Sequence, residues 1–293
     1  MPETLDYLKR MTSPGNITPN LQQIMDGIEQ LWPASLAESW DAVGLVVGRP
    51  EQEIRKVIWV VDPSLPVVED AVQRGADLII SHHPLMLKPV NGVSALTPKG
   101  RVIHTMIENQ CALLTAHTNG DSAVGGVSDV LAEILGLEEC VPLTQAAGGL
   151  PEEGIGRVGY LASPTTLGDF AGKVYGILPK VAGGVRVSGP RDAIVSRVAI
   201  CGGAGDSLFD AVRSANADVY VTADLRHHPA LEAKEATLDG RPYLVDVSHF
   251  ASEWMWLPAA AQSLINYAED SGWDVEIMVS NVNSDPWDFC LNG

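Results

Sequence analysis

The sequence has few cysteines and no long apolar run, and each shortage excludes a class of protein. Its 293 residues include four cysteines, at positions 111, 140, 201 and 290, and no two of them form a CxxC motif. Neither a disulfide framework nor a thiolate metal site is therefore expected. No apolar run approaches the ~20 residues that a membrane-spanning helix needs, so a membrane is not an expected partner.

Basic side chains are also scarce. The chain has 19 Lys and Arg residues against 37 Asp and Glu residues, which gives a formal net charge of −18. Such a charge repels nucleic acid and anionic membranes unless a local patch or bound cations reverse it. The first residues, MPETLDYLKR, lack the basic-then-apolar layout of a signal peptide. Together with the sparse cysteines, this predicts a cytoplasmic protein that does not bind nucleic acid.

Short apolar runs recur along the chain, with helical patterns between several of them. The expected strands are residues 56–62, 77–81, 112–117, 197–201, 218–223, 243–247 and 275–280. A helix is expected near the N-terminus, with Thr18 as its cap and Pro19 at its first position. The alternation predicts an α/β protein with mixed sheets. We expect two α/β lobes, residues 1–145 and 193–293, joined by a glycine-rich linking segment at 146–192.

Two glycine-rich stretches raise the question of phosphate binding. Residues 154–159 match GxGxxG, but they follow a loop and lead into an apolar run, so we predict a strand entry there and not a dinucleotide motif. Gly202, Gly203 and Gly205 lie between an expected strand and a helix start. Amides at such a start attract anions, which makes the three glycines candidate phosphate contacts. Alternatively, they allow a tight turn that needs positive φ angles.

Polar side chains follow three of the expected strands, at the end of the sheet where ligands bind in open α/β folds. These side chains are His82 and His83, then His117, Asn119 and Asp121, then Asp246, His249 and Glu253. In a helix, the spacing of His249 and Glu253 places both on one face. Any one of the histidines alone could be a buried, hydrogen-bonded imidazole. Imidazoles and carboxylates together at three strand ends instead predict a divalent-cation site.

Eight short motifs occur in the order found in the Nif-three-like proteins, and the sequence resembles that family over nearly its whole length. The motifs are SWDAVGLVVG (39–48), SHHPL (81–85), TAHTNGD (115–121), GIGRVG (154–159), CGGAGD (201–206), VTADLRHH (221–228), DVSHFASE (246–253) and SDPW (284–287). The family consists of ring-hexameric proteins with a dinuclear metal centre, catalogued as type-two homologues of GTP cyclohydrolase I. The resemblance therefore implies a ring homohexamer.

The resemblance also implies a set of metal ligands. His83 and Asp121 would hold one ion, His82 and His249 the other, and Glu253 would bridge both, in the cleft between the two lobes. Three histidines and two carboxylates suit Zn, Fe or Mn better than Mg. Two divalent ions with only two carboxylates leave the pocket locally positive, which favours an anionic small molecule such as a nucleotide.

Paired ions can activate a water molecule and stabilise a developing oxyanion. We therefore predict a metal-dependent hydrolase that acts on a nucleotide or related heterocycle, with GTP ring opening as the family's name implies. Glu253, Asp224 and His228 are the candidate catalytic groups. Asp224, His227 and His228 could shuttle protons or contact substrate, or could form a capped turn with solvated histidines. The alternative function is a metal carrier or regulatory assembly without chemistry, because fold alone does not decide activity.

Overall fold

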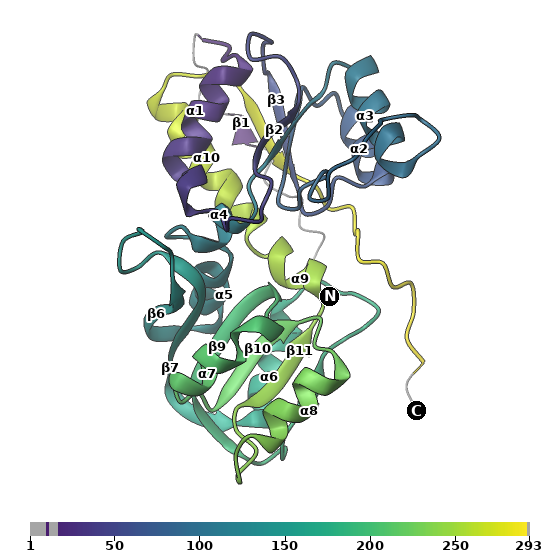
Figure 1. Cartoon of the computed structure of the whole chain (residues 1–293). Helices are drawn as coiled ribbons and strands as arrows, with labels where there is room; N and C mark the ends of the chain where they lie inside the picture. The colour runs from purple at the N-terminus through teal and green to yellow at the C-terminus, as the bar shows by residue number, and fades with distance from the viewer. Residues whose placement is uncertain (1–9, 12–16, 292–293) are drawn as a thin grey trace. The chain divides into compact units, whose positions relative to one another are not determined.

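The computed structural model describes residues 10–11 and 17–291, and it contains two units that each hold a six-stranded mixed sheet (Figure 1). Unit 1 comprises the described residues up to Gly120 together with Leu257–Ser284, and unit 2 comprises Asp121–Trp256 and the described residues from Asp285 on. The predicted α/β class with mixed sheets is confirmed, as are all seven predicted strands.

The sheet of unit 1 has a parallel centre and antiparallel edges. Its order is β1-β12-β3-β4-β5-β2, in which β12, β3, β4 and β5 run parallel. The strands are β1 (Arg10–Met11), β2 (Gly44–Val47), β3 (Lys56–Val60), β4 (Leu78–Ser81), β5 (Ala112–Thr115) and β12 (Glu276–Val279). The helices are α1 (Leu21–Leu31), η1 (Ala34–Leu36), α2 (Leu65–Gln73), α3 (Pro98–Glu108) and α10 (Leu257–Asp270), and the short α4 (Thr118–Ser122) crosses the unit boundary.

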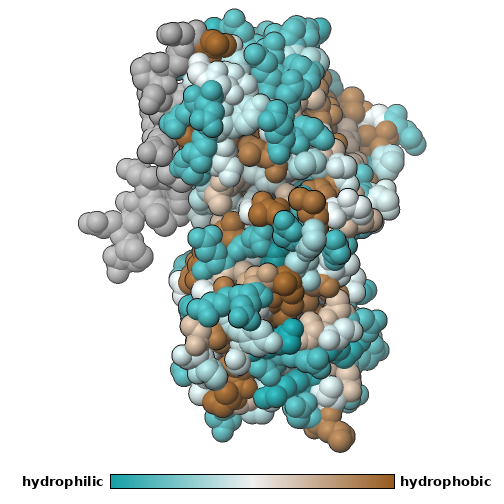
Figure 2. Space-filling model, turned by 90° about the vertical axis from the view of Figure 1, so that its left-hand side faces the viewer, coloured by the Kyte–Doolittle hydropathy of each residue, from teal (hydrophilic) through white to brown (hydrophobic). Residues whose placement is uncertain are grey.

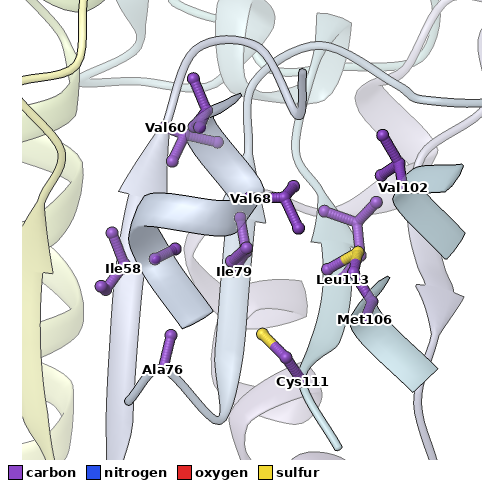
Figure 3. Packing of buried hydrophobic residues seen from close by; sticks show 11 residues of the cluster. Ile58, Val60, Val68, Ala76, Ile79, Val102, Met106, Cys111 and Leu113 are labelled. Carbon is purple, nitrogen blue, oxygen red and sulfur yellow. The ribbon is translucent and has the colours of Figure 1, made fainter. Parts of the chain in front are cut away.

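Both faces of this sheet are covered, α1 and α10 lying on one side and α2 and α3 on the other (Figure 1). Ile58, Ile79 and Leu113 pack under α2 and α3 (Figure 3). Trp59 and Ile80, the next residues along β3 and β4, are also fully buried. Double-sided burial explains the continuous apolar runs, because strands of a covered parallel sheet have no solvated face. The result is a rigid support for the residues that follow β3, β4 and β5.

The sheet of unit 2 has the order β6-β7-β9-β10-β11-β8, with β9, β10 and β11 parallel. The strands are β6 (Leu137–Gln145), β7 (Gly154–Thr166), β8 (Arg186–Ser188), β9 (Ile194–Ala204), β10 (Val219–Ala223) and β11 (Tyr243–Val247). The helices are α5 (Val127–Leu135), α6 (Leu167–Ile177), η2 (Asp206–Leu208), α7 (Phe209–Ser214), α8 (His227–Glu235) and α9 (His249–Trp254). Side chains from α7 and α8 complete an apolar core on these strands.

The structure divides the chain differently from the predicted lobes. The C-terminal helix α10 and strand β12 return to the first sheet, where β12 pairs with β3. The glycine-rich segment 146–192 contains β7, α6 and β8, which belong to the second sheet. Gly154 and Gly156 open β7 with positive φ angles. The sequence predicted a strand entry at residues 154–159 and not a dinucleotide motif, and β7 begins at Gly154 as predicted.

The first helix begins two residues later than predicted. Asn20, not Thr18, caps α1: its side chain accepts a hydrogen bond from the Gln23 amide, and the Gln23 side chain accepts one from the Asn20 amide. Asn20 also forms an isolated β-bridge with Glu53, and the Pro19 carbonyl accepts a hydrogen bond from the Ile54 amide. The chain is therefore held extended through Pro19, and this reciprocal capping pair sets the helix start.

On the face drawn in Figure 2, apolar residues occur in small groups between larger hydrophilic areas. None of the helices within the described ranges is both long and apolar enough to span a bilayer.

Candidate metal centre

His82 and His83 stand directly after β4, at the carboxyl end of the parallel strands of unit 1. Their amides continue the sheet pattern, donating to the carbonyls of Val60 and Val61 at 2.9 Å each. His82 is fully buried and His83 is partly buried. Both residues lie in a bend directly after the strand, and their ring centroids are 5.2 Å apart, so the two imidazoles are neighbours.

A hydrogen-bond acceptor holds the Nδ1 atom of each of these rings. His82 Nδ1 lies 3.1 Å from the Ala116 carbonyl, and His83 Nδ1 lies 2.7 Å from Asp62 Oδ1. Ser284 donates a 2.5 Å hydrogen bond to the other oxygen of Asp62. Carbonyl and carboxylate oxygens only accept, so the ring proton belongs on Nδ1. In the neutral ring, Nε2 then carries the lone pair, which is the tautomer needed to bind a metal through Nε2.

His117 joins these two histidines from the end of β5. Its Nδ1 atom lies 2.9 Å from Asp41 Oδ1, while Thr118 donates to Asp41 Oδ2 through its amide at 3.0 Å and its hydroxyl at 2.5 Å. Burial by itself would raise the pKa of Asp41, but the hydrogen bonds from His117 and Thr118 outweigh it and hold that pKa well below its usual range. Donor atoms of His82, His83 and His117 lie within 4.8 Å of one another and could hold a metal ion.

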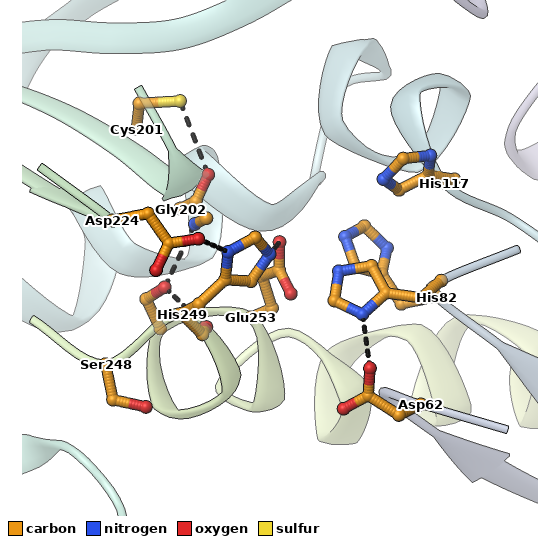
Figure 4. Close-up of polar contacts among 12 residues, drawn as sticks. Asp62, His82, His117, Cys201, Gly202, Asp224, Ser248, His249 and Glu253 are labelled. Carbon is orange, nitrogen blue, oxygen red and sulfur yellow. Dashed lines mark hydrogen bonds and ion pairs between the residues drawn. The ribbon is translucent and has the colours of Figure 1, made fainter. Parts of the chain in front are cut away.

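A second cluster forms in unit 2, where Ser248 caps α9 directly after β11 (Figure 4). His249 and Glu253 occupy one face of this helix, as their spacing predicted, and His249 Nε2 lies 2.9 Å from Glu253 Oε1. His249 Nδ1 lies 2.7 Å from Asp224 Oδ2. Burial lowers the pKa of His249, but the charge of Glu253 and the hydrogen bonds to Asp224 and Glu253 raise it to about 11. The two carboxylates therefore favour the protonated imidazole, which would have to give up its Nε2 proton to bind a metal ion.

Gly203 makes the close approach of this cluster to β9 possible. Its φ angle is +68°, and a Cβ atom placed on it would lie well under 3.0 Å from Glu253 Oε1 and 3.3 Å from His249 Nε2. Its amide donates a 3.0 Å hydrogen bond to Ser252 Oγ. A side chain at this position would displace the Glu253 carboxylate.

Close packing also requires glycine at positions 202 and 205. A Cβ atom would overlap Val127 at Gly202 and Tyr220 at Gly205. Helix α7 begins only at Phe209, after the turn η2, and has six residues. Close packing thus accounts for Gly202, Gly203 and Gly205, and a phosphate contact at these residues stays a prediction.

Asn119 lies in unit 1, where its side chain donates a 2.8 Å hydrogen bond to the Trp32 carbonyl, whereas Asp121, His227 and His228 lie in unit 2. Asp121 lies in α4 and is partly buried. Burial raises the pKa of the Cys201 thiol, and the charges of Asp121 and Glu253 raise it further. His227 and His228 begin α8 and are exposed. Within the described ranges, the groups able to hold a metal include neither of them.

Three carboxylates beside the histidines have roles that the sequence did not predict. Asp41 contacts His117 and Asp62 contacts His83, while Asp224, a predicted proton-transfer group, holds His249 Nδ1. The positions of two of them in the sequence could have indicated these roles. Asp62 follows the carboxyl end of β3 and Asp224 follows that of β10, just as the histidines follow the carboxyl ends of their own strands.

The chemistry of the side chains fits a divalent ion. The first cluster offers three imidazoles and the second offers one, each with its Nδ1 held by an oxygen acceptor, and the second adds Glu253, whose side chain is 4% exposed. Such acceptors orient ligating histidines in metalloproteins. Imidazole and carboxylate donors suit Zn, Fe or Mn. His82, His83, His117, His249 and Glu253 are thus residues that could hold metal.

Comparison with known proteins decides the family. A profile described as Duf34/NIF3 (NGG1p interacting factor 3) matches residues 19–286. The chain belongs to this family. A Streptomyces coelicolor protein named GTP cyclohydrolase 1 type 2 homolog is 46% identical over 271 residues, covering 92% of this chain and 94% of its own. A Mycobacterium tuberculosis protein of the same name is 32% identical, with coverage of 92% and 97%.

Two solved structures share the fold. A Bacillus cereus protein related to NIF3 superposes with a TM-score of 0.85 at 25% identity, covering 94% of this chain and 100% of its own. The reduced HcgD from Methanocaldococcus jannaschii gives a TM-score of 0.73 at 29% identity, covering 90% and 98%. The resemblance inferred from the eight motifs is confirmed.

Proposed function

We propose that this DUF34/NIF3 protein is a metal-dependent hydrolase that acts on a nucleotide or related heterocycle. The observation that supports this most is the set of histidines whose Nδ1 atoms are all held by oxygen acceptors, together with the buried Glu253 carboxylate. The shared name of the relatives, GTP cyclohydrolase 1 type 2 homolog, supports GTP as the first substrate to test.

The proposed ligands are those that the family resemblance implies. We propose that His82, His83, Asp121, His249 and Glu253 hold two divalent ions, with Zn, Fe or Mn as candidates. When bound, such ions supply Lewis acidity and lower the pKa of a coordinated water. The two carboxylates in the ligand set would cancel half of the charge of two divalent ions, and the carboxylates of Asp62 and Asp224, which contact His83 and His249, would offset the remainder.

The side chains around the ligands have separate tasks in this proposal. Asp62 and Asp224 hold the Nδ1 protons of their histidines and so fix the orientation of each ring. Glu253 is confined by the Gly203 backbone on one side. His228 is exposed and is proposed to contact substrate or carry a proton. Asp224, which is engaged with His249, orients that ligand and is not the first choice for proton transfer.

Self-association as a ring homohexamer and a cytoplasmic location are part of the same proposal, and both rest on sequence reasoning. Light scattering of the purified protein tests the assembly: a hexamer is expected, and a monomer at micromolar concentration would contradict it.

The test of function compares three preparations with GTP as the probe. Wild-type protein is stripped with a chelator, reloaded with Zn, Fe or Mn, and assayed for GTP consumption by chromatography. Turnover should disappear on stripping and return on reloading. His82→Ala should bind less metal and show no turnover, whereas His228→Ala should keep its metal and fold but turn over more slowly. If His228→Ala loses metal while His82→Ala keeps it, the site is assigned to the wrong residues.

The second candidate function is a metal carrier or regulatory assembly without chemistry, which the same metal-binding clusters would support. Fully loaded protein that consumes neither GTP nor other nucleotides, yet transfers its ion to an acceptor chelator faster than free exchange allows, would favour this alternative.

A further inference from the structure

Trp40 is an exposed aromatic residue beside the histidine cluster of unit 1. Its ring centroid lies 6.0 Å from that of His117, with the two rings nearly perpendicular at 78°. Trp40 is 59% exposed. Trp40 therefore leaves an aromatic surface open to solvent beside a cluster of titratable groups.

The turn that carries Trp40 is fixed on both sides. The Glu38 amide donates a 2.9 Å hydrogen bond to Thr118 Oγ1, and the Asp41 amide donates to the Glu38 carbonyl at 2.9 Å. Asp41 then accepts hydrogen bonds from Thr118 and contacts His117 Nδ1. The segment on either side of Trp40 is therefore held in place by hydrogen bonds to His117 and Thr118, and Trp40 is exposed although its backbone is anchored.

Other exposed aromatic residues lack this setting. Trp287 is 70% exposed and Phe289 is 76% exposed, yet neither is among the rings that stack against a histidine of the two clusters. Trp40 is distinguished by rigid placement and by its contact with His117.

We propose that Trp40 is the stacking platform for a planar, aromatic heterocyclic base, which makes it the residue that selects a nucleobase-bearing ligand at this site. The inference rests on the proposed function only in taking the metal site that includes His82 and His83 as the reaction centre, and His117 lies with these two histidines. Every nucleobase has a π-face, so an indole held in place can bind one without a specific hydrogen-bond pattern. The histidine cluster beside it would receive the reacting part of the same molecule.

The experiment measures equilibrium binding of guanosine, GTP and ribose 5-phosphate by calorimetry, with Trp40→Ala, Trp40→Phe and Trp287→Ala compared with wild type. Trp287→Ala is the matched control, since it removes an exposed indole elsewhere on the surface. Removing one stacking side chain weakens binding of a base by about 5- to 150-fold. Trp40→Ala should show such a loss for guanosine and GTP, Trp40→Phe should restore most of it, and Trp287→Ala should show none. Affinity for ribose 5-phosphate, which has no base, should not change with Trp40→Ala.

Three results would overturn the inference: wild type that binds no guanosine, Trp40→Ala that binds guanosine as wild type does, or an equal loss for ribose 5-phosphate. Light scattering on Trp40→Ala tests a fourth outcome. A change of oligomeric state would make Trp40 a subunit contact and would also overturn the inference. The two proposals can fail separately. A protein that turns over no nucleotide but needs Trp40 to bind guanosine refutes the hydrolase proposal alone. Turnover with an unchanged KM for GTP in Trp40→Ala refutes the stacking proposal alone.

Discussion

Gly203 offers a sharp test of the second cluster, because Gly272 matches it in backbone conformation but not in surroundings. The φ angles are +68° at Gly203 and +67° at Gly272. A Cβ atom at Gly203 would overlap Glu253 Oε1, whereas a Cβ atom at Gly272 would have no neighbour within 4 Å. The two alanine substitutions therefore share the cost of a left-handed backbone, and only one of them crowds the site.

The expected difference in stability between Gly203→Ala and Gly272→Ala follows from the cost of the backbone conformation and the cost of crowding. A left-handed conformation costs a residue with a side chain about 1–2 kcal/mol, which is the whole effect expected for Gly272→Ala. Crowding a packed position adds about 1–3 kcal/mol, so Gly203→Ala should lower the free energy of unfolding by about 2–5 kcal/mol in all. Because the shift displaces the Glu253 carboxylate, Gly203→Ala should also bind metal more weakly, while Gly272→Ala should bind it normally.

The assay is urea denaturation of chelator-stripped protein, followed by a metal titration of each variant. Stripping first separates the cost of strain from the stabilisation that bound metal contributes. Equal losses of stability in the two variants, together with equal metal affinity, would refute the claim that Gly203 is needed for the close approach of Glu253.

Other substitutions test the supporting contacts. Asp62→Asn and Asp224→Asn should each lower metal affinity by about 10- to 100-fold, the usual effect of removing a carboxylate that orients a ligating histidine; unchanged affinity in a chelator competition would argue against that role. Asp129→Ala should destabilise unit 2 by about 3–5 kcal/mol in urea denaturation, because Arg157, whose side chain is 2% exposed, would lose its ion-pair partner. The same variant should keep its metal, and a loss of stability below about 1 kcal/mol, the value typical of an exposed pair, would count against this reasoning.

Much of the fold could be predicted because buried parallel strands leave a clear pattern. β3, β4, β5 and β10 are covered on both faces and appear in the sequence as continuous apolar runs. The position of His82 and His83 after β4 and the helical spacing of His249 and Glu253 were also readable. Each of these features depends on residues close together in the sequence.

The rest depends on contacts between distant residues. Asp41 is 76 positions from His117, and Asp62 is 21 positions from His83, so neither pairing leaves a local pattern. The return of α10 and β12 to the first sheet is equally non-local and shifts the unit boundary to Gly120. Glycine-rich composition at 146–192 indicated a linking segment, but several of these glycines serve close packing: a Cβ atom at Gly154 would meet the Thr144 backbone, and one at Gly159 would meet Cys140.

The most direct test of the two-ion proposal is the metal content of each chain, measured by elemental analysis on reconstituted wild type, Glu253→Ala and Asp121→Ala. Wild type should hold about two divalent ions per chain, the number expected of a two-metal site. Glu253→Ala should lose both, because a bridging carboxylate serves both ions, and Asp121→Ala should lose mainly one. Wild-type protein that takes up no metal, or Glu253→Ala that keeps the wild-type content, would contradict the account.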